Sequence, residues 1–358
     1  MLYRTAGQFK TTYRADQALF PVRQDAYLLG IILILAWAVL PLTASEFAFQ
    51  TLLIPVLIYA LAALGLNLLT GYAGQLSLGT GAFMGVGAYA CYKLVTLFPE
   101  LNLVVAVLLS GLFSAAVGVL FGLPSLRIKG FYLAIATLAA QFFLVWLFEK
   151  WGWLYNYNAS GAIQVPNVQM FGIWVAGPLA TSTAQYYFVL GIVTLLTLVA
   201  INITRGSAGR TWKAVRDMDI AAELIGINLM KAKLYAFAVS SYIVGVAGAL
   251  FVFMWRGAAE PNLFDIELSF RVLFIAIIGG LGSILGNYLG AILIVALPVI
   301  LNTVPGAMGL AIKSATVEHI NAIIVGCLII FFLIVEPHGL ARLWQLIREK
   351  LMLWPFPH

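Results

Sequence analysis

The segment GYAGQLSLGTGAFMGVGAY, residues 71–89, contains six glycines in 19 residues and lies between segments rich in Leu, Ile and Val. Glycine in an exposed helix interior is less favourable than alanine by about 1 kcal/mol. A strongly apolar chain that concentrates glycine here needs a reason other than helix propensity. Gly81 and Gly85 have the four-residue spacing at which small residues let membrane helices approach closely, and Gly87, Ala82 and Ala88 extend this small surface. The first interpretation of the segment is therefore tight helix packing.

Polar side chains in the same segment suggest a second interpretation. Polar groups beside a glycine break are unfavourable against lipid but are tolerated next to a water-filled cavity. The candidates for a translocation path are Asn67, Gly71, Tyr72, Gln75, Ser77, Gly79 and Thr80. A second stretch, IGGLGSILGN at 278–287, has the same character and adds Gly279, Gly280, Gly282, Ser283 and Asn287. Paired broken segments of this kind are typical of an internal repeat around a central path.

The composition of the chain excludes a soluble domain. Hydrophobic residues make up 63% of the 358 residues and charged residues only 9%, whereas a soluble domain has roughly 25% charged residues. Most of this apolar surface has to face lipid, so we expect an all-α integral membrane protein with one membrane domain. Cys91 and Cys327 form no CxxC pair, and His319, His338 and His358 have no metal-ligand spacing. We therefore expect no disulfide, metal or cofactor.

Ten apolar segments are candidates for membrane-spanning helices, which need about 20 residues. The predicted spans are 27–44, 49–70, 76–98, 102–123, 130–148, 185–204, 234–255, 268–282, 284–302 and 319–336. The eighth and ninth meet at the second glycine-rich stretch and could form one interrupted unit. The chain thus divides into a polar segment 1–26, a transmembrane domain 27–336 and a tail 337–358. The first apolar run exceeds the core of a signal peptide, and the small residues at 43–45 keep cleavage there as an alternative.

Basic residues indicate the orientation of the spans. With the N-terminus inside, the interior segments 1–26, 124–129, 205–233 and 337–358 contain four, two, six and three of them, which is 15 of the 20 Lys and Arg residues. Cytoplasmic loops carry such an excess, so we expect both termini and the 205–233 loop to be cytoplasmic. The same bias explains the net charge of +6 without any nucleic-acid binding.

The longest exterior loop, 149–184, is rich in aromatic residues, namely Trp151, Trp153, Tyr155, Tyr157 and Trp174. Aromatic side chains at this position are typical of an interfacial belt at the membrane surface. The alternative is that this loop caps the mouth of the path or forms a docking surface.

The interior loop 205–233 has the pattern of an amphipathic helix over about 211–225. Lys213 and Asp217 lie four residues apart, where they can pair, and Gly226 is placed to end the helix. Such a helix either lies on lipid headgroups or inserts into a groove of a cytoplasmic partner, and Asp217, Asp219 and Glu223 weaken the lipid alternative. The small or apolar residues that recur at steps of three and four are Ala214, Val215, Met218, Ala221, Ala222 and Ile225.

The sequence shows no energy source of its own. The phosphate-binding pattern GxxxxGK[ST] does not occur. No Asp or Glu lies deep within a predicted span, where proton- or sodium-coupled carriers usually keep ionisable groups. The chain is therefore predicted either to depend on a partner that supplies energy or to be a passive channel for a small neutral solute. A membrane enzyme would need convergent His, Glu or Asp groups, which these spans lack.

Three stretches of the chain resemble the permease subunits of branched-chain amino acid ABC importers. They are LNLLTGYAGQLSLGTGAFMGVGAY (66–89), GRTWKAVRDMDIAAELIGINLMKAKLYAFAVSSYIVGVAGAL (209–250) and GGLGSILGNYLGA (279–291). They occur in the order found in that family. The likeness is to the second of the two related permeases and covers residues from about 50 to 340.

This resemblance implies a heteromeric importer of a bacterial inner membrane. Its partners would be a second permease subunit, two cytoplasmic ATPases that hydrolyse the ATP, and a periplasmic solute-binding protein, so the chain itself would be no enzyme. The solute would be a branched-chain or similar zwitterionic amino acid, whose end charges backbone dipoles at broken helices can meet. Urea, short amides and aromatic acids are the alternatives, because relatives import them.

The resemblance also assigns a role to the 205–233 loop, which in that family is the coupling segment that docks on the ATPase. Trp212 departs from the smaller aliphatic residue expected at its position. The residues that correspond to the coupling segment are Gly209, Arg210, Ala214, Arg216, Asp217, Ala221, Ala222, Glu223 and Gly226.

Overall fold

The structure is a computed structural model that describes residues 11–12, 23–125, 132–158, 160–170, 172–307, 314–335 and 339–353. Most of the predicted polar segment 1–26, most of the interior loop 124–129, and His338 and His358 lie outside the described residues.

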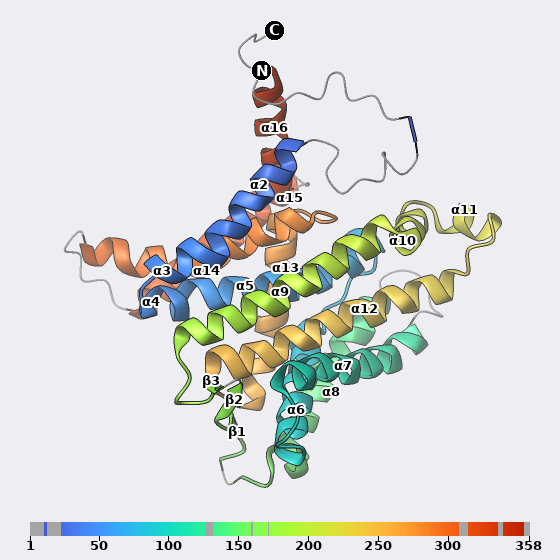
Figure 1. The fold of residues 1–358 in the computed structure, drawn as a ribbon. Helices are drawn as coiled ribbons and strands as arrows, with labels where there is room; N and C mark the ends of the chain where they lie inside the picture. Colours follow the sequence, from blue (N-terminus) through green and yellow to red (C-terminus); the bar gives the residue numbers. More distant parts are fainter. Residues whose placement is uncertain are drawn as a thin grey trace.

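The first half of the described chain consists of helices joined by short connections (Figure 1). They are α2 Arg23–Ile34, α3 Leu40–Thr43, α4 Glu46–Ala48, α5 Ile54–Asn67, α6 Thr80–Leu97, α7 Leu103–Ser125 and α8 Tyr132–Lys150. Three π-helical turns extend or join them: η1 Leu35–Val39, η2 Phe49–Leu53 and η3 Leu68–Tyr72. The chain leaves the helix after η3 and enters α6 at Thr80, so the predicted glycine break is present.

The second half continues with α9 Ser182–Arg205, α10 Ser207–Asp217, α11 Asp219–Leu224, α12 Leu229–Leu250, α13 Ile266–Gly279, α14 Ile284–Ala307, α15 Ser314–Val335 and α16 Gly339–Leu353. A π-helical turn, η5 Phe251–Arg256, extends α12. Two 3₁₀ turns lie at η4 Gly152–Tyr155 and η6 Pro261–Phe264. A second break, at residues 280–283, separates α13 from α14.

Six helices within the described ranges are long and apolar enough to cross a membrane. They are Glu46–Tyr72, Leu103–Leu123, Tyr132–Lys150, Ser182–Arg205, Leu229–Arg256 and Ile284–Thr303, and shorter apolar helices cover Tyr27–Thr43 and Ala322–Phe332. With 14 residues, α13 is about 21 Å long and too short to cross alone. The all-α membrane fold is confirmed, whereas the number of ten crossings stays a prediction.

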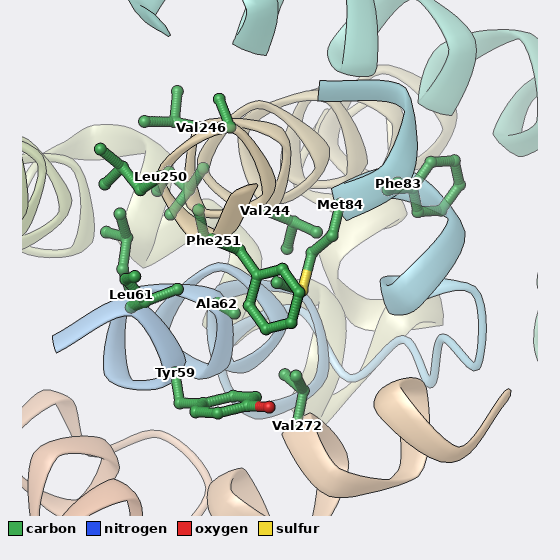
Figure 2. Close-up of a cluster of buried hydrophobic side chains, with 14 of the residues drawn as sticks. Tyr59, Leu61, Ala62, Phe83, Met84, Val244, Val246, Leu250, Phe251 and Val272 are labelled. Atoms are coloured by element: carbon green, nitrogen blue, oxygen red, sulfur yellow. The ribbon is translucent and has the colours of Figure 1, made fainter. Parts of the chain in front are cut away.

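The core forms around α5 and α12. Their spans are 83% buried within the chain, while the other four spans are 28–39% buried and expose apolar side chains, as helices that face lipid do. Helix α12 packs against α5, α6 and α7. Figure 2 shows Leu61 of α5, Met84 of α6 and Leu250 of α12 in the resulting cluster, and all three side chains are fully buried.

Glycine permits the close approach of α6 and α12. A Cβ atom at Gly248 would lie 1.9 Å from the carbonyl oxygen of Met84, and one at Gly87 would lie 2.0 Å from that of Gly245. A Cβ atom at Gly85 would lie 2.5 Å from a ring carbon of Phe148. No side chain fits at these contacts of α6 with α12 and α8, so the packing interpretation of the glycine-rich segment is confirmed.

The predicted 149–184 loop contains regular structure. Strands β2 Val168–Met170 and β3 Ile173–Ala176 form an antiparallel pair, and β1 Ile163–Gln164 pairs with β4 Ala258–Ala259, which follows η5. These strands have two to four residues, too few for an alternating pattern to be recognised in the sequence. Figure 1 places β1–β3 at the opposite end of α9 and α12 from α10 and α11.

Candidate functional site

Asn67 joins the two glycine-rich segments. Its side chain is fully buried at the end of α5. The Nδ2 atom donates to the carbonyl oxygen of Ser283 at 3.0 Å and to Oδ1 of Asn287 at 3.1 Å, and Oδ1 accepts from the N–H of Gly282 at 2.7 Å. A buried amide is stable only when it is hydrogen bonded. Asn67 therefore holds the end of α5 against the break between α13 and α14.

Gly71 and Gly282 bring two backbones into direct contact beside Asn67. A Cβ atom at Gly71 would lie 2.2 Å from the nitrogen of Gly282 and 2.0 Å from Oδ1 of Asn67. Gly282 has φ +82°, a left-handed conformation that favours glycine. We call Asn67, Gly71, Gly282, Ser283 and Asn287 the glycine junction. The structure thus brings together members of both predicted path segments.

Side chains from α8 and α13 cap the start of α6. The N–H of Gly81 donates to Oγ of Ser269 at 2.8 Å, and the N–H of Ala82 donates to Oε1 of Gln141 at 2.8 Å. Gln141 also donates through Nε2 to the carbonyl oxygen of Phe264 at 2.6 Å. Free amides at a helix start can bind an anion, but these two are satisfied within the chain. Sequence reasoning missed Gln141 and Ser269; the available signal was a glutamine inside an apolar span.

The predicted path residues are largely buried within this chain. Gln75 donates through Nε2 to the carbonyl oxygen of Lys233 at 3.4 Å, a contact near the limit for a hydrogen bond. Oε1 of Gln75 and Nδ2 of Asn287 have no hydrogen-bond partner among the described residues. The role of all these residues in lining a translocation path stays a prediction. The buried members are Tyr72, Gln75, Ser77, Gly79, Thr80, Gly279, Gly280 and Asn287, while Gly282 and Ser283 are partly exposed.

The predicted helix 211–225 consists of two helices, so the single helix was wrong. Helix α10 ends at Asp217, Met218 is extended with φ −152° and ψ 94°, and α11 begins at Asp219. The break has a local cause, because aspartate is a poor residue for a helix interior but is favourable in a first turn. Gly226 follows α11 with φ +89°, as expected for the residue that ends a helix.

Trp212 anchors α10 to the rest of the chain. Its side chain is 1% exposed, and its ring lies 5.6 Å from that of Tyr235 on α12. Gly209 lies against the carbonyl group of Thr204, where a Cβ atom would approach the oxygen to 2.0 Å. Trp212, which departs from the smaller residue expected there, therefore fills an internal position.

Arg216 points toward the glycine junction. Its Nη1 atom donates to the carbonyl oxygen of Gly71 at 2.6 Å, while Nε and Nη2 each lie 2.8 Å from Oδ1 of Asp217. Lys213, the predicted partner of Asp217, instead places its ammonium group 5.5 Å from the centre of the Tyr72 ring. Two of the three basic side chains of α10, Lys213 and Arg216, thus contact the end of η3, whereas Arg210 donates to the carbonyl oxygen of Arg205.

The tip formed by Met218, α11 and Ile225 exposes large apolar side chains. Met218, Ile220, Leu224 and Ile225 are 71%, 66%, 83% and 76% exposed, whereas Ala222 is only 2% exposed. The predicted stripe is therefore divided between an inward and an outward side. Among the other coupling candidates, Arg210, Arg216, Asp217, Ala221, Glu223 and Gly226 are exposed and Ala214 is intermediate.

The opposite end of the chain holds Lys93 of α6. Its Nζ atom bonds to Oδ1 of Asn156 and lies 4.2 Å from the centre of the Trp153 ring. Trp151 and Tyr157 are 50% and 77% exposed, and whether they form an interfacial belt or a docking surface stays a prediction. Within the described ranges, no three His, Cys, Asp or Glu residues are placed to hold a metal ion together.

A sequence profile of the family described as "Branched-chain amino acid transport system / permease component" matches residues 48–333. The chain belongs to this permease family. This match confirms the resemblance to the permease subunits of branched-chain amino acid ABC importers. Family membership makes the chain a multi-pass membrane permease and not an enzyme.

Three relatives illustrate the range of similarity. The high-affinity branched-chain amino acid transport system permease protein LivM of Salmonella typhimurium is 32% identical over 299 residues, or 76% of this chain and 68% of the relative. LivM of Escherichia coli is 32% identical over 298 residues, with the same shares covered. LivH of Salmonella typhimurium is 22% identical over 255 residues, or 66% of this chain and 79% of the relative. The comparison with solved structures found no significant match.

Proposed function

We propose that this chain is a permease subunit of an ATP-driven importer for branched-chain amino acids. The family membership and the names of the relatives support this solute class. The proposed partners are a second permease subunit, two cytoplasmic ATPases and a periplasmic solute-binding protein. The proposed location is a bacterial inner membrane, with both termini and α10–α11 in the cytoplasm, as the distribution of basic residues favours.

The observation that carries the proposal is the division of the 207–225 segment into an anchored helix and an exposed tip. Trp212 is buried, while Leu224 and Ile225 are more than three-quarters exposed. Large apolar side chains on a soluble loop mark a site for protein or membrane contact. Asp217 borders the tip, and Asp219 and Glu223 lie within it; these acidic groups oppose contact with anionic lipid. A groove on an ATPase is the occupant that matches both properties.

The test is uptake by vesicles that contain the chain with its genomic partner subunits. We expect labelled leucine, isoleucine or valine to accumulate in the vesicles only when ATP is present on the side of the membrane that holds the ATPases and the binding protein is present on the opposite side. Flux that is independent of ATP would instead favour a passive channel. ATP-driven uptake of urea, amides or aromatic acids without branched-chain amino acids would keep the permease role and reject the solute.

A further inference from the structure

The break between α13 and α14 is contacted from three other elements. Asn67 of α5 binds Gly282 and Ser283. Gly71 of η3 lies against Gly282. Gly339, at the start of α16, lies against Gly280, where a Cβ atom placed on Gly339 would be 2.7 Å from the nitrogen of Gly280. Gly280 and Gly282 both have positive φ, at +113° and +82°. The backbone at this break is therefore held in one unusual conformation by its neighbours.

Arg216 connects α10 to this arrangement. Its side chain packs against two glycines. A Cβ atom placed on Gly74 would lie 2.7 Å from Cγ of Arg216, and one placed on Gly282 would lie 3.8 Å from its Nη1 atom. Nη1 donates to the carbonyl oxygen of Gly71, and the other side of the guanidinium group is held by Asp217. The planar guanidinium group can make both contacts at once, which a lysine ammonium group cannot do in the same geometry.

We propose that Arg216 is the positioning residue through which α10 controls the break between α13 and α14. A shift of α10 moves the guanidinium group and with it the carbonyl group of Gly71. Because neither Gly71 nor Gly282 has a side chain that could absorb the shift, the movement passes to the hydrogen bond between Asn67 and Gly282. Packed backbones of this kind switch between arrangements and do not deform continuously. The inference rests on the proposed function, since it supplies the path from the ATPase-facing tip to a helix break.

A merely structural role for Arg216 makes different predictions. The carbonyl oxygen of Gly71 lies at the end of a helix, where a basic side chain often satisfies free carbonyl groups. In that case, loss of Arg216 would lower the stability of the chain but would leave the Gly282 amide and the ratio of uptake to ATP hydrolysis unchanged.

The experiment compares Arg216→Gln, Arg216→Lys and wild type in the assembled importer in lipid nanodiscs and vesicles. Arg342→Gln is the matched control, because Arg342 is an exposed arginine whose Nη1 atom donates to Oε1 of Gln345, three residues away on the same helix. The first readout is hydrogen exchange of a peptide covering 279–288, which reports the Gly282 amide. The second is leucine uptake per ATP hydrolysed, and the third is retention of the ATPase on the tagged permease.

We expect exchange at 279–288 to rise roughly tenfold in Arg216→Gln, as for loss of a hydrogen bond to a charged group. Uptake per ATP should fall by a similar factor, with the ATPase retained. Arg216→Lys should show a smaller change in the same direction, and it replaces Arg216→Gln in the comparison if the glutamine variant does not fold. Arg342→Gln should match wild type in all three readouts. Unchanged exchange, unchanged uptake per ATP, or loss of the ATPase would each overturn the proposal. If the wild-type importer showed no ATP-driven uptake, the proposed function would be rejected. The exchange comparison would still show whether Arg216 acts on the break between α13 and α14.

Discussion

At the scale of single residues, Asn67 is the polar group on which the contact between the two glycine-rich segments depends. Its buried side chain makes three hydrogen bonds to residues more than 200 positions away in the sequence, of which the bond to Asn287 is fully buried and those to Gly282 and Ser283 are partly buried. Replacement by alanine removes these bonds and leaves the N–H of Gly282 and the carbonyl group of Ser283 without this partner. The substitution therefore acts on long-range packing and not on helix propensity.

We expect Asn67→Ala to lower the free energy of unfolding by about 1–3 kcal/mol, the cost of leaving buried polar groups unsatisfied. The measurement is the thermal unfolding midpoint of the purified chain in detergent, followed by intrinsic fluorescence. Asn302→Ala is the control, because Asn302 is exposed and donates to the carbonyl oxygen of Pro298 on its own helix. Equal midpoints for the two variants would contradict the importance of the junction.

At the scale of elements, the crossing of α6 and α12 depends on glycine. The Cβ atom of Gly248→Ala would meet the backbone of Met84, which cannot rotate away as a side chain can. We expect destabilisation at the upper end of the range for overpacked cores, about 3 kcal/mol. Gly326→Ala is the control, since nothing lies within 4 Å of its Cβ position. The stability of both variants is measured as the fraction of protein that stays monodisperse after heating. If Gly248→Ala were as stable as wild type, α6 and α12 could move apart without cost.

The exposed tip around α11 is the second element for which the structure changes the choice of substitution. Ala222 is buried, so a tryptophan there would disturb the chain itself, whereas Ala221 is exposed and suits a test of docking. We expect Ala221→Trp and Leu224→Asp to reduce retention of the ATPase about tenfold or more, as for a central interface contact. Leu224→Met should retain the ATPase, because it stays large and apolar. If Leu224→Asp pulled down the ATPase as well as wild type does, the tip would not be the docking site.

At the scale of the whole molecule, hydropathy predicted the membrane class and most span positions, because about 20 apolar residues are needed wherever a helix meets lipid. The spacing of Gly81 and Gly85 predicted close packing for an equally general reason. The contact between Asn67 and Asn287 was not predictable, since nothing local encodes a partner 220 positions away. The break at Met218 and the short strands near Ile163 were missed because each is decided by very few residues. Arg216 was expected to face a partner, and its contact with Gly71 became visible only when the fold placed α10 beside η3.

The arrangement of the two ends also makes a prediction about sidedness. Helix α9 joins β3 to α10, and its 24 residues span about 36 Å, more than the hydrocarbon core of about 30 Å. Ile173 on β3 and Ser207 on α10 are both exposed, so a cysteine at either position can react with a maleimide. The background should carry Cys327→Ser, because Cys327 is exposed, while the buried Cys91 can remain.

In intact cells, a membrane-impermeant maleimide should label Ile173→Cys and should label Ser207→Cys only after the membrane is opened. The physical reason is the excess of Lys and Arg in the segment after α9, which favours the cytoplasmic side for that segment. Labelling of both residues from outside would place α9 on the membrane surface, and labelling of Ser207→Cys alone would invert the molecule. In the inverted case the exposed apolar tip would lie where no ATPase can reach it, so this one measurement bears on the topology and on the source of energy together.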